Sequence, residues 1–304
     1  MALLYKLNLY IEPMISIVIS SANPALLKQV TENIEATIGT PYQLIATNNS
    51  EGKQGICEVY NNAIAQVQYD IICFIHEDII IKTRNWGIIL KNIFDEHPQT
   101  GLVGVAGGGY KPIAPSTWGG FGINNSYVNI LQSYKHADQE PKLDYRNPDD
   151  VKLARVACVD GVWLAITTKI AKEFKFDEDT FKGFHVYDID YSLTVGQKYE
   201  VCVTYEILIN HLSEGHYSRE WVIDTLKLYD KWKEHLPINI VNFNYQERRI
   251  VEKITFKRFI DQLKELGFPA SVALDWLRNN KPFKEMKLYW KLVFYTYKIY
   301  YLKS

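Results

Sequence analysis

The chain has few cysteines and no long apolar run, and each shortage excludes a class of protein. Its four cysteines among 304 residues form no CxxC pair, so neither a disulfide framework nor a cysteine-ligated zinc site is expected. Cys73 and Cys202 lie inside apolar runs, which indicates buried thiols in a reducing compartment. No apolar run approaches the roughly 20 residues that cross a bilayer, and the N-terminus lacks a secretory signal pattern. We therefore expect a cytoplasmic protein.

Familiar phosphate-binding motifs are also missing. Segment 101–122 is rich in glycine but contains neither a Walker A sequence nor a GxGxxG match, so its glycines favour close backbone approach in a loop. No recognition motif for nucleic acid accompanies the basic residues, and no nucleic-acid partner is expected. The remaining composition, 47% hydrophobic and 23% charged, is typical of a globular protein with an ample core.

Charge is divided unevenly along the chain. The net charge is -1, yet residues 247–304 hold 13 Lys and Arg against 6 Asp and Glu, a balance of +7 that leaves -8 for the rest. The change falls near Leu236-Pro237, where a helical pattern ends. We predict three parts: an N-terminal leader or edge segment at 1–13, a main domain at 14–236, and a basic, aromatic-rich helical extension at 237–304.

Strand and helix patterns alternate through the first 75 residues. Asn23 and Pro24 have the types preferred at the N-cap and N1 positions of a helix, which Gly39 can end. The predicted strands are 15–20, 42–47 and 70–75, with helices from Asn23 to Gly39 and at 56–68. This order predicts a βαβαβ half of a doubly wound α/β sheet.

The third of these strands ends in three residues able to bind metal ions or protons. The apolar run from Ile71 leads directly into His76, Glu77 and Asp78. Ligands of open α/β sheets bind just beyond the carboxyl ends of such strands. A carboxylate pair there could join a divalent cation to a phosphate-bearing substrate, although a solvated loop would show the same residues.

Three later segments repeat this combination of an apolar element and titratable residues. Asp160-Gly161 precedes a strand pattern at 162–165, and is equally typical of a tight turn. The acids of 184–191 precede a helix pattern through 195, where the helix dipole favours acids without any function. His211 follows a predicted strand at 201–209, and a lone histidine is usually structural. Together the segments indicate a divalent site at Asp78 and His211 and a general base at Asp188.

The order of these segments over about 14–237 resembles the GT-A glycosyltransferases, in particular the family-2-like bacterial enzymes. ISIVISS is similar to their first strand and ATNNS to the end of their second. VYNNAIAQVQYDIICFIHEDI resembles the segment that leads to the DxD motif, VDGVWLAI the floor of the acceptor side, FHVYDIDYSL the motif of the inverting base, and INHLS the late histidine that completes metal coordination. The resemblance implies a Rossmann-like, mixed and mainly parallel sheet flanked by helices, followed by a C-terminal helical extension.

The resemblance also implies a role for individual residues. The nucleotide-sugar side comprises Ser20, Ser21, Asn48, Asn49, Asn61, His76, Glu77 and Asp78. The acceptor or donor-sugar side comprises Asp160, Gly161, Trp163, His185 and Asp190. The metal ligands are Asp78 and His211, and the catalytic base is Asp188. Two positions depart from the family pattern: His76 replaces the first acid of the DxD motif, and Tyr187 replaces the Glu before the base. His76 then takes over the ribose or metal contact of that acid, or the contact is not made.

The implied activity is inverting, hexosyltransferase-type transfer with Mn²⁺ or Mg²⁺, as in polysaccharide biosynthesis. A UDP-sugar is the favoured donor, and a glycan or lipid-linked saccharide is the acceptor. One alternative is a GT-A-like module that binds nucleotide or glycan without transfer. A nucleotidyltransferase fits less well, because Ser20-Ser21-Ala22-Asn23-Pro24 stands where that class carries a Gly-rich, basic segment.

The last segment suggests a surface role. If 284–302 forms one helix, Lys284, Lys287, Lys291 and Lys298 fall within an arc of about 60°. Opposite them lie Met286, Tyr289, Val293, Tyr297 and Tyr300, with Trp290, Phe294 and Tyr301 on the flank. Such a helix suits peripheral contact with the inner face of a membrane, and it suits equally well docking on the protein itself or on a partner.

Overall fold

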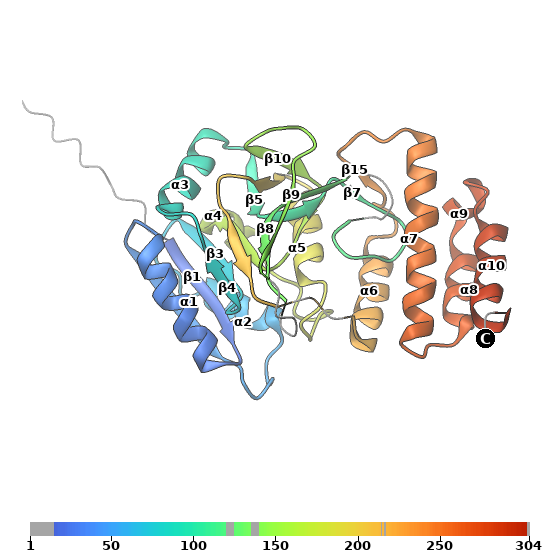
Figure 1. Ribbon diagram of the computed structural model, residues 1–304, viewed down its shortest axis with the longest axis horizontal. Helices are drawn as coiled ribbons and strands as arrows, with labels where there is room; N and C mark the ends of the chain where they lie inside the picture. The colour runs from blue at the N-terminus through green and yellow to red at the C-terminus, as the bar shows by residue number, and fades with distance from the viewer. Residues whose placement is uncertain (1–14, 120–124, 135–139, 214, 216, 303–304) are drawn as a thin grey trace, which may run out of the picture.

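The computed structural model describes residues 15–119, 125–134, 140–213, 215 and 217–302. Its centre is a seven-stranded sheet in the order β10-β13-β5-β12-β3-β1-β2, with helices on both sides (Figure 1). The N-terminal segment 1–13 lies outside the described residues.

The predicted βαβαβ unit forms the first half of this sheet. Its elements are β1 (Ile15–Ser21), α1 (Pro24–Thr37), β2 (Tyr42–Asn48), α2 (Ile56–Ile64) and β3 (Ile71–Ile75). β1 pairs in parallel with both β2 and β3. The Asn23 side chain caps α1 by accepting from the amides of Ala25 and Leu26, and Gly39 adopts a positive φ of 72° after its end. The α/β class and these helix signals are therefore confirmed.

One boundary in this unit was predicted wrongly. The helix expected at 56–68 ends at Ile64. Beyond it, the Gln68 amide donates to the Oε1 atom of Gln43 at 3.0 Å, and the Gln43 side chain in turn donates to the Gln66 carbonyl at 3.1 Å. The side chain of Gln43 on β2 thus bonds to backbone groups of residues 66 and 68, which would otherwise have bonded within a longer helix.

The second half makes the sheet mixed. β12 (Trp163–Thr167) runs antiparallel between β3 and β5 (Thr100–Gly104), and β10 (Leu153–Val156) is antiparallel to β13 (Glu200–Thr204). Pairs β1–β2, β1–β3 and β13–β5 are parallel. The helices of this half are α3 (Trp86–Glu96), α4 (Thr168–Glu173) and α5 (Tyr187–Val195). A mixed sheet with both orientations matches the prediction.

A second sheet crosses above the first and carries part of the site. Its strands are β4 (Ile79–Ile81), β6 (Ala106–Gly108), β8 (Ser126–Gln132), β9 (Lys142–Arg146), β11 (Cys158–Val159) and β14 (Ile209–His211). The strand predicted over 201–209 is wrong: it splits into β13 in the main sheet and β14 in this one. Asn129 explains the split, because its side-chain amide donates to the carbonyls of Tyr205 and Ile207 and holds the connecting bend.

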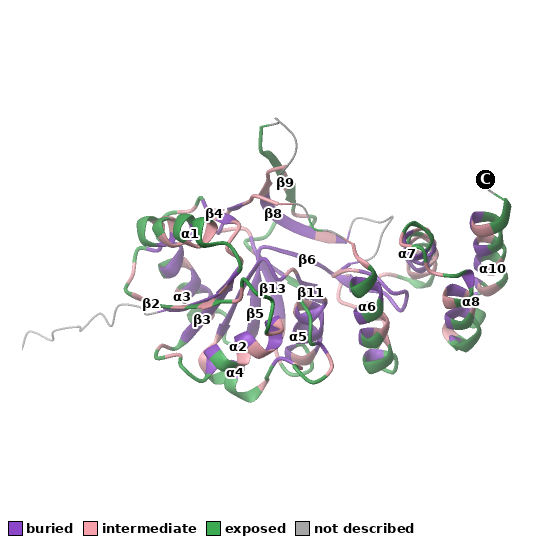
Figure 2. Ribbon diagram, turned by 90° about the horizontal axis from the view of Figure 1, so that it is seen from below, coloured by how far each residue is buried: buried purple, intermediate pink, exposed green. Residues whose placement is uncertain are grey.

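The C-terminal extension packs on the main domain. After α6 (Arg219–Trp232), β15 (Ile238–Asn239) pairs with β7 (Tyr110–Lys111). The helices that follow are α7 (Tyr245–Glu265), α8 (Ala270–Asn279), α9 (Lys281–Glu285), α10 (Tyr289–Tyr297) and the π-helical turn η1 (Lys298–Leu302). A shared apolar cluster joins Phe256 and Phe259 of α7 to Ile113 and Val222. Figure 2 shows α8 and α10 at the end of the molecule farthest from α1.

The single helix predicted at 284–302 is wrong. Lys287 has a φ of 57°, which an α-helix does not allow, so the segment divides into α9, α10 and η1. Within the described parts of the chain, no helix combines the length and hydropathy that crossing a bilayer requires.

Candidate functional site

The turn after β3 and the end of β14 bring three metal-binding side chains together. β14 pairs antiparallel with β4, which sets His211 opposite Ile79. His211 Nε2 lies 3.5 Å from Asp78 Oδ2, and His76 Nδ1 lies 4.0 Å from Asp78 Oδ1. One ligand atom from each of the three residues lies within 4.8 Å of the others. Two ligands about 2.1 Å from one ion are separated by at most about 4.2 Å, so this donor set fits a divalent metal after small side-chain movements.

The hydroxyl of Tyr187 fixes which nitrogen of His76 is available. Tyr187 donates its one hydrogen to the carbonyl of Gly161 at 3.1 Å. His76 Nε2, 2.7 Å from the same hydroxyl oxygen, is then the donor of the second bond. The lone pair of the imidazole therefore lies on Nδ1, the nitrogen that faces Asp78. A hydrogen bond of this kind on the outer nitrogen orients histidine ligands in metal sites.

Charge within this group favours a neutral His76 and an ionised Asp78. Burial lowers the pKa of His76. Burial alone would raise the pKa of Asp78, but hydrogen bonds from His211 and Ser213 outweigh it and hold that pKa below its usual range. His211 would likewise have its pKa lowered by burial, but its contact with Asp78 raises the pKa above the ordinary value. Ser213 Oγ donates to Asp78 Oδ2 at 2.5 Å.

Asp188 occupies the neighbouring part of the site. Its Oδ2 accepts from the Gly161 amide and its Oδ1 from the Ile189 amide, both at 2.9 Å. Burial, together with the charge of Asp160, raises the pKa of Asp188 to about 7. A carboxyl group with such a pKa can both accept and release a proton near neutral pH. Asp160 is itself held by the indole of Trp118, 2.9 Å from its Oδ2.

The turn that joins these groups has no room for a larger residue. A Cβ on Gly161 would lie 2.1 Å from the Tyr187 hydroxyl and 3.1 Å from the Cβ of Asp188. Antiparallel pairing of β12 with β3 sets this turn beside the β3 exit, where the His76 amide donates to the Val162 carbonyl at 3.1 Å. We call His76, Asp78 and His211 the metal-type group. Gly161 therefore allows this group and Asp188 to approach each other.

The start of α5 is strained. Val186, the residue before the helix, has a φ of 58°, a region that β-branched residues rarely adopt. Backbone strain of this kind costs about 1–3 kcal/mol and is concentrated at functional sites. Here it orients the first turn of α5, which carries Tyr187 and Asp188.

Glu77, predicted on the nucleotide-sugar side, has its bonding partners in the turn between β1 and α1. Its carboxylate accepts from Ser21 Oγ at 2.7 Å and from the amides of Ala22 and Asn23 at 3.1–3.2 Å. It therefore closes the turn between β1 and α1. Ser21 was predicted to lie near a nucleoside, and its hydroxyl donates to Glu77 instead. Ser20 is the residue before Ser21 in β1.

The asparagines predicted on the nucleotide side occupy different places. Asn48 ends β2 with an exposed side chain whose Oδ1 accepts from the Ser50 amide. Asn49 binds Gln54 through both side-chain atoms and braces the following loop. Asn61, on α2, bonds to Phe176 and Glu178. Asn48 is thus the last residue of β2 and Asn49 follows it, whereas Asn61 joins α2 to the loop after α4.

Three residues predicted on the acceptor side are either buried in the core or bonded to other side chains. Trp163 is buried in the core against Trp86, with ring centroids 6.1 Å apart. Asp190 accepts from the Trp232 indole at 2.7 Å and pairs with Lys231. His185 Nε2 lies 3.3 Å from Ser218 Oγ. Residues two apart on a helix face different sides, which explains why Asp190 faces α6 while Asp188 faces Gly161.

Sequence reasoning missed Trp118, Ser213 and Phe184. Trp118 lies in a loop whose path depends on distant contacts, and no local pattern singles it out. Ser213 follows His211 by two residues, so it was within reach of the INHLS comparison. Phe184 has an exposed ring 5.4 Å from that of His76, and its exposure became visible only in the structure.

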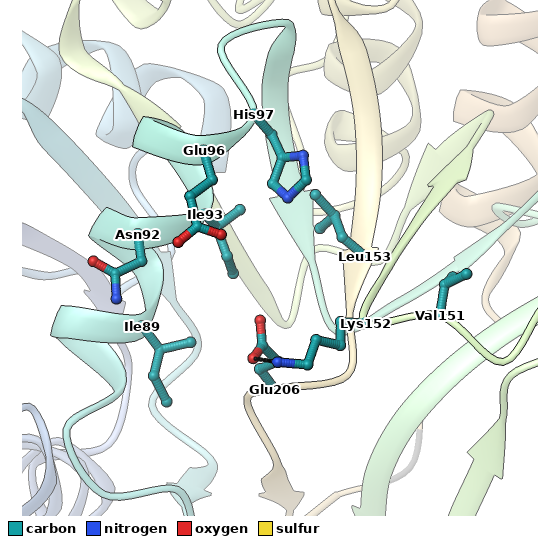
Figure 3. A pocket seen from close by; sticks show the side chains of 9 residues that line it. All are labelled: Ile89, Asn92, Ile93, Glu96, His97, Val151, Lys152, Leu153 and Glu206. Atoms are coloured by element: carbon teal, nitrogen blue, oxygen red, sulfur yellow. Dashed lines mark hydrogen bonds and ion pairs between the residues drawn. The ribbon is translucent and has the colours of Figure 1, made fainter.

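One cavity of the described residues lies apart from this site. It has a volume of about 540 Å³ and lies between α3 and the ion pair of Lys152 with Glu206 (Figure 3). None of the candidate site residues lines it. The side chains of His76, Asp78 and His211 are partly buried, with exposed fractions of 18–20%.

Comparison with known proteins gives this arrangement a context. Residues 15–236 match the model of a family described as "Glycosyltransferase like family". No curated protein matches the sequence. Two solved structures are similar over most of the chain at 10% identity and a TM-score of 0.50: GalNAc-T7 with UDP, GalNAc and Mn²⁺, over 96% of this chain, and TarS from S. aureus, over 90%. The chain spans 58% and 49% of their lengths. The predicted GT-A fold is confirmed.

Proposed function

Because the chain belongs to the glycosyltransferase-like family, we propose that it moves a hexosyl group from a nucleotide-diphosphate sugar to an acceptor hydroxyl, with inversion. One observation carries the proposal. His76 bonds to the Tyr187 hydroxyl, which donates to the Gly161 carbonyl, and the amide of the same Gly161 donates to Asp188. These bonds join the metal-type group to a carboxyl group whose pKa is about 7. Inverting transfer needs these two functions side by side.

His76, Asp78 and His211 are the residues that would hold a divalent ion. Bound there, the ion would supply positive charge to the diphosphate as it departs. Two imidazoles with one carboxylate favour Mn²⁺ over Mg²⁺, since Mg²⁺ prefers oxygen ligands. The presence of UDP, GalNAc and Mn²⁺ in the GalNAc-T7 structure supports a UDP-sugar and Mn²⁺ as the first choices.

Asp188 is the proposed general base. In its ionised form the carboxylate takes the proton of the acceptor hydroxyl, whose oxygen forms a bond to the anomeric carbon from the face opposite the diphosphate. The bond from the anomeric carbon to the diphosphate oxygen breaks, and its electron pair leaves with the nucleotide. One displacement inverts the anomeric centre and leaves the proton on Asp188.

The acceptor we propose is a glycan or a lipid-linked saccharide, handled in the cytoplasm during polysaccharide synthesis. We propose that the acceptor sugar contacts Asp160, whose charge acts on Asp188, and the exposed ring of Phe184, which lies 5.4 Å from that of His76. Aromatic rings commonly supply the apolar surface of ligand sites. We also propose that the catalytic unit is 14–236, the extension is 237–304, and 1–13 is a leader or edge segment.

Asp188→Asn separates binding from chemistry. A thermal-shift screen of UDP-, GDP-, CMP- and dTDP-sugars, with and without Mn²⁺, first identifies the donor, because a ligand of the native state raises the melting temperature. Transfer from that donor should then fall about 10²- to 10⁴-fold in the variant, the usual contribution of a general base. Donor affinity should stay within about threefold.

Asp230→Asn, an exposed acid on α6, serves as the control and should transfer at the parent rate. Undiminished turnover in Asp188→Asn would remove Asp188 from its role. Donor binding by the parent without transfer to any acceptor, and without hydrolysis, would favour the alternative of a non-catalytic nucleotide- or glycan-binding module.

A further inference from the structure

The last helix exposes a row of large aromatic side chains. Trp290, Phe294 and Tyr297 on α10 and Tyr301 on η1 have exposed fractions of 77%, 67%, 48% and 67%. Their spacing of four, three and four residues places them on one side of a helix. Exposed aromatic groups of this extent mark an interaction surface. We call these four residues the aromatic face.

The opposite side of the same segment already has its partner. Leu292, Thr296 and Ile299 are buried, and α10 contacts α8 and α7. Tyr295 donates to Asp261 of α7 at 3.0 Å. The segment therefore docks on the protein itself through its buried side, which carries Leu292, Thr296 and Ile299. The aromatic face takes no part in this packing. It lies on the outermost helix of the molecule (Figures 1 and 2).

Lysines border the aromatic face without any acid to balance them. Residues 286–304 contain four Lys and neither Asp nor Glu. Lys287, Lys291 and Lys298 are exposed, and within the described part of the chain none of the three has a carboxylate partner. On a helical projection of α10, Trp290, Phe294 and Tyr297 cover about 60°, and Lys291 and the C-cap residue Lys298 lie beside them.

From this arrangement we propose that the aromatic face docks on a lipid surface that carries anionic headgroups. Trp and Tyr prefer the boundary between headgroups and acyl chains, since their rings are apolar and their N–H or O–H groups remain hydrated. Lysines beside them reach the phosphate layer and are attracted to anionic lipids. A protein partner would require acids to match the lysines, and the contact needs no chemistry at the Asp188 site.

Vesicle co-sedimentation of the full chain tests this proposal. We expect the protein to sediment with vesicles of phosphatidylcholine and phosphatidylglycerol at a ratio of 7:3, and only weakly with pure phosphatidylcholine. Raising the salt should release it, because attraction to a charged surface is screened. Equal binding to both vesicle types, or none to either, would overturn the proposal.

Two double variants locate the surface. Trp290→Ala/Phe294→Ala removes apolar contact, and Lys291→Glu/Lys298→Glu reverses charge; all four side chains are exposed, so the fold should persist. Each lysine near an anionic surface contributes roughly fivefold to partitioning, so the charge variant should bind at least about 25-fold more weakly. The aromatic variant should lose binding to both vesicle types.

Matched controls carry the same changes elsewhere on the surface. Lys172→Glu/Lys175→Glu alters the charge equally, and Leu143→Ala/Tyr145→Ala removes two exposed apolar side chains of β9; both should bind as the parent does. Parent-like binding by the α10 variants would show that another surface contacts lipid. A dimer that dissociates in Trp290→Ala/Phe294→Ala, without vesicle binding by the parent, would assign the aromatic face to a second copy of the chain.

Discussion

At the scale of single residues, the hydroxyl of Tyr187 connects the two halves of the site. It bonds to the metal-type group through His76 and to the turn beside Asp188 through Gly161. The resemblance to GT-A glycosyltransferases implies that Tyr187 and His76 each stand where the family pattern has an acid. The structure shows that these two unusual residues contact each other. The two departures from the family pattern are therefore joined by one hydrogen bond of 2.7 Å.

Tyr187→Phe should weaken Mn²⁺ binding about 10- to 100-fold, the usual effect of removing a hydrogen bond to a ligand histidine. Without the hydroxyl, His76 no longer has its Nε2 proton fixed. Calorimetric titration of the folded protein with Mn²⁺ measures the change. Tyr191→Phe is the matched control, since this tyrosine of the same helix donates to the Phe174 carbonyl, away from the metal-type group. Equal losses in the two variants would contradict the positioning role.

Asp188 should make both activity and stability depend on pH. The ionised form is the base, so transfer should increase through about pH 7, the pKa of this carboxyl group. Because that pKa is raised above its ordinary value of 3.8 by burial, the folded protein holds the proton more tightly than the unfolded chain. This contribution to stability is complete below about pH 3.8 and is lost as pH rises towards 7.

Melting temperatures measured from pH 4 to pH 8 test whether the contribution of Asp188 to stability decreases as pH rises. Asp188→Asn cannot ionise, so its melting temperature relative to the parent should become more positive as pH increases. The same series on Asp230→Asn, which changes an exposed acid outside the site, is the control. A difference for Asp188→Asn that stays flat or falls with pH would contradict the raised pKa.

At the scale of elements, α7 supports the loop that reaches the site. Glu252 of α7 is fully buried, and accepts from the Tyr110 hydroxyl at 2.8 Å and from the Ile113 and Ala114 amides at 2.9 Å. Lys111 then holds the carbonyls of Ser116 and Thr117. The next residue, Trp118, donates to Asp160. A helix of the extension thus controls the position of a residue beside Asp188.

Glu252→Ala should destabilise the protein by about 3 kcal/mol or more, since it leaves three buried donors without an acceptor. Transfer should fall as well, because the loop that carries Trp118 loses its anchor. Urea denaturation measures the first effect and donor turnover the second. Glu265→Ala, an exposed acid on the same helix, should change stability by less than about 0.5 kcal/mol. A small effect of Glu252→Ala on stability would contradict the proposal that Glu252 anchors the loop that carries Trp118.

These elements show what the sequence could and could not predict. The β1 to β3 unit was predictable because strand runs, an N-cap asparagine and a C-terminal glycine are local signals. Pairing of β4 with β14, which brings His211 to Asp78, joins residues about 130 positions apart and leaves no local mark. His211 was paired with Asp78 from the residue types at two predicted strand ends and from the resemblance to known sequences, and the structure brings the two side chains together. Trp118 was missed because Glu252 holds its loop from another part of the chain.

At the scale of the whole molecule, the division of charge corresponds to a division of surfaces. The basic extension ends in the aromatic face and its lysines, whereas the site is rich in acids: Glu77, Asp78, Asp160 and Asp188. The two parts nevertheless share an apolar cluster and the β7–β15 pair. The extension predicted from composition is therefore packed as part of one body, with its own outward surface.

Glu77 has a consequence for the order in which ligands bind. Helix N-termini commonly hold phosphate through free amides, but at α1 the amides of residues 22, 23, 25 and 26 are already occupied by Glu77 and Asn23. A free diphosphate would meet carboxylates there and find no donors from the turn. We expect an ordered sequence, with the cation first, so that UDP alone binds weakly and titration after Mn²⁺ shows strong binding. Equal affinity with and without Mn²⁺ would exclude this order. If the cation binds first, it acts as an entry requirement, because a nucleotide that arrives without it finds no donors at the start of α1.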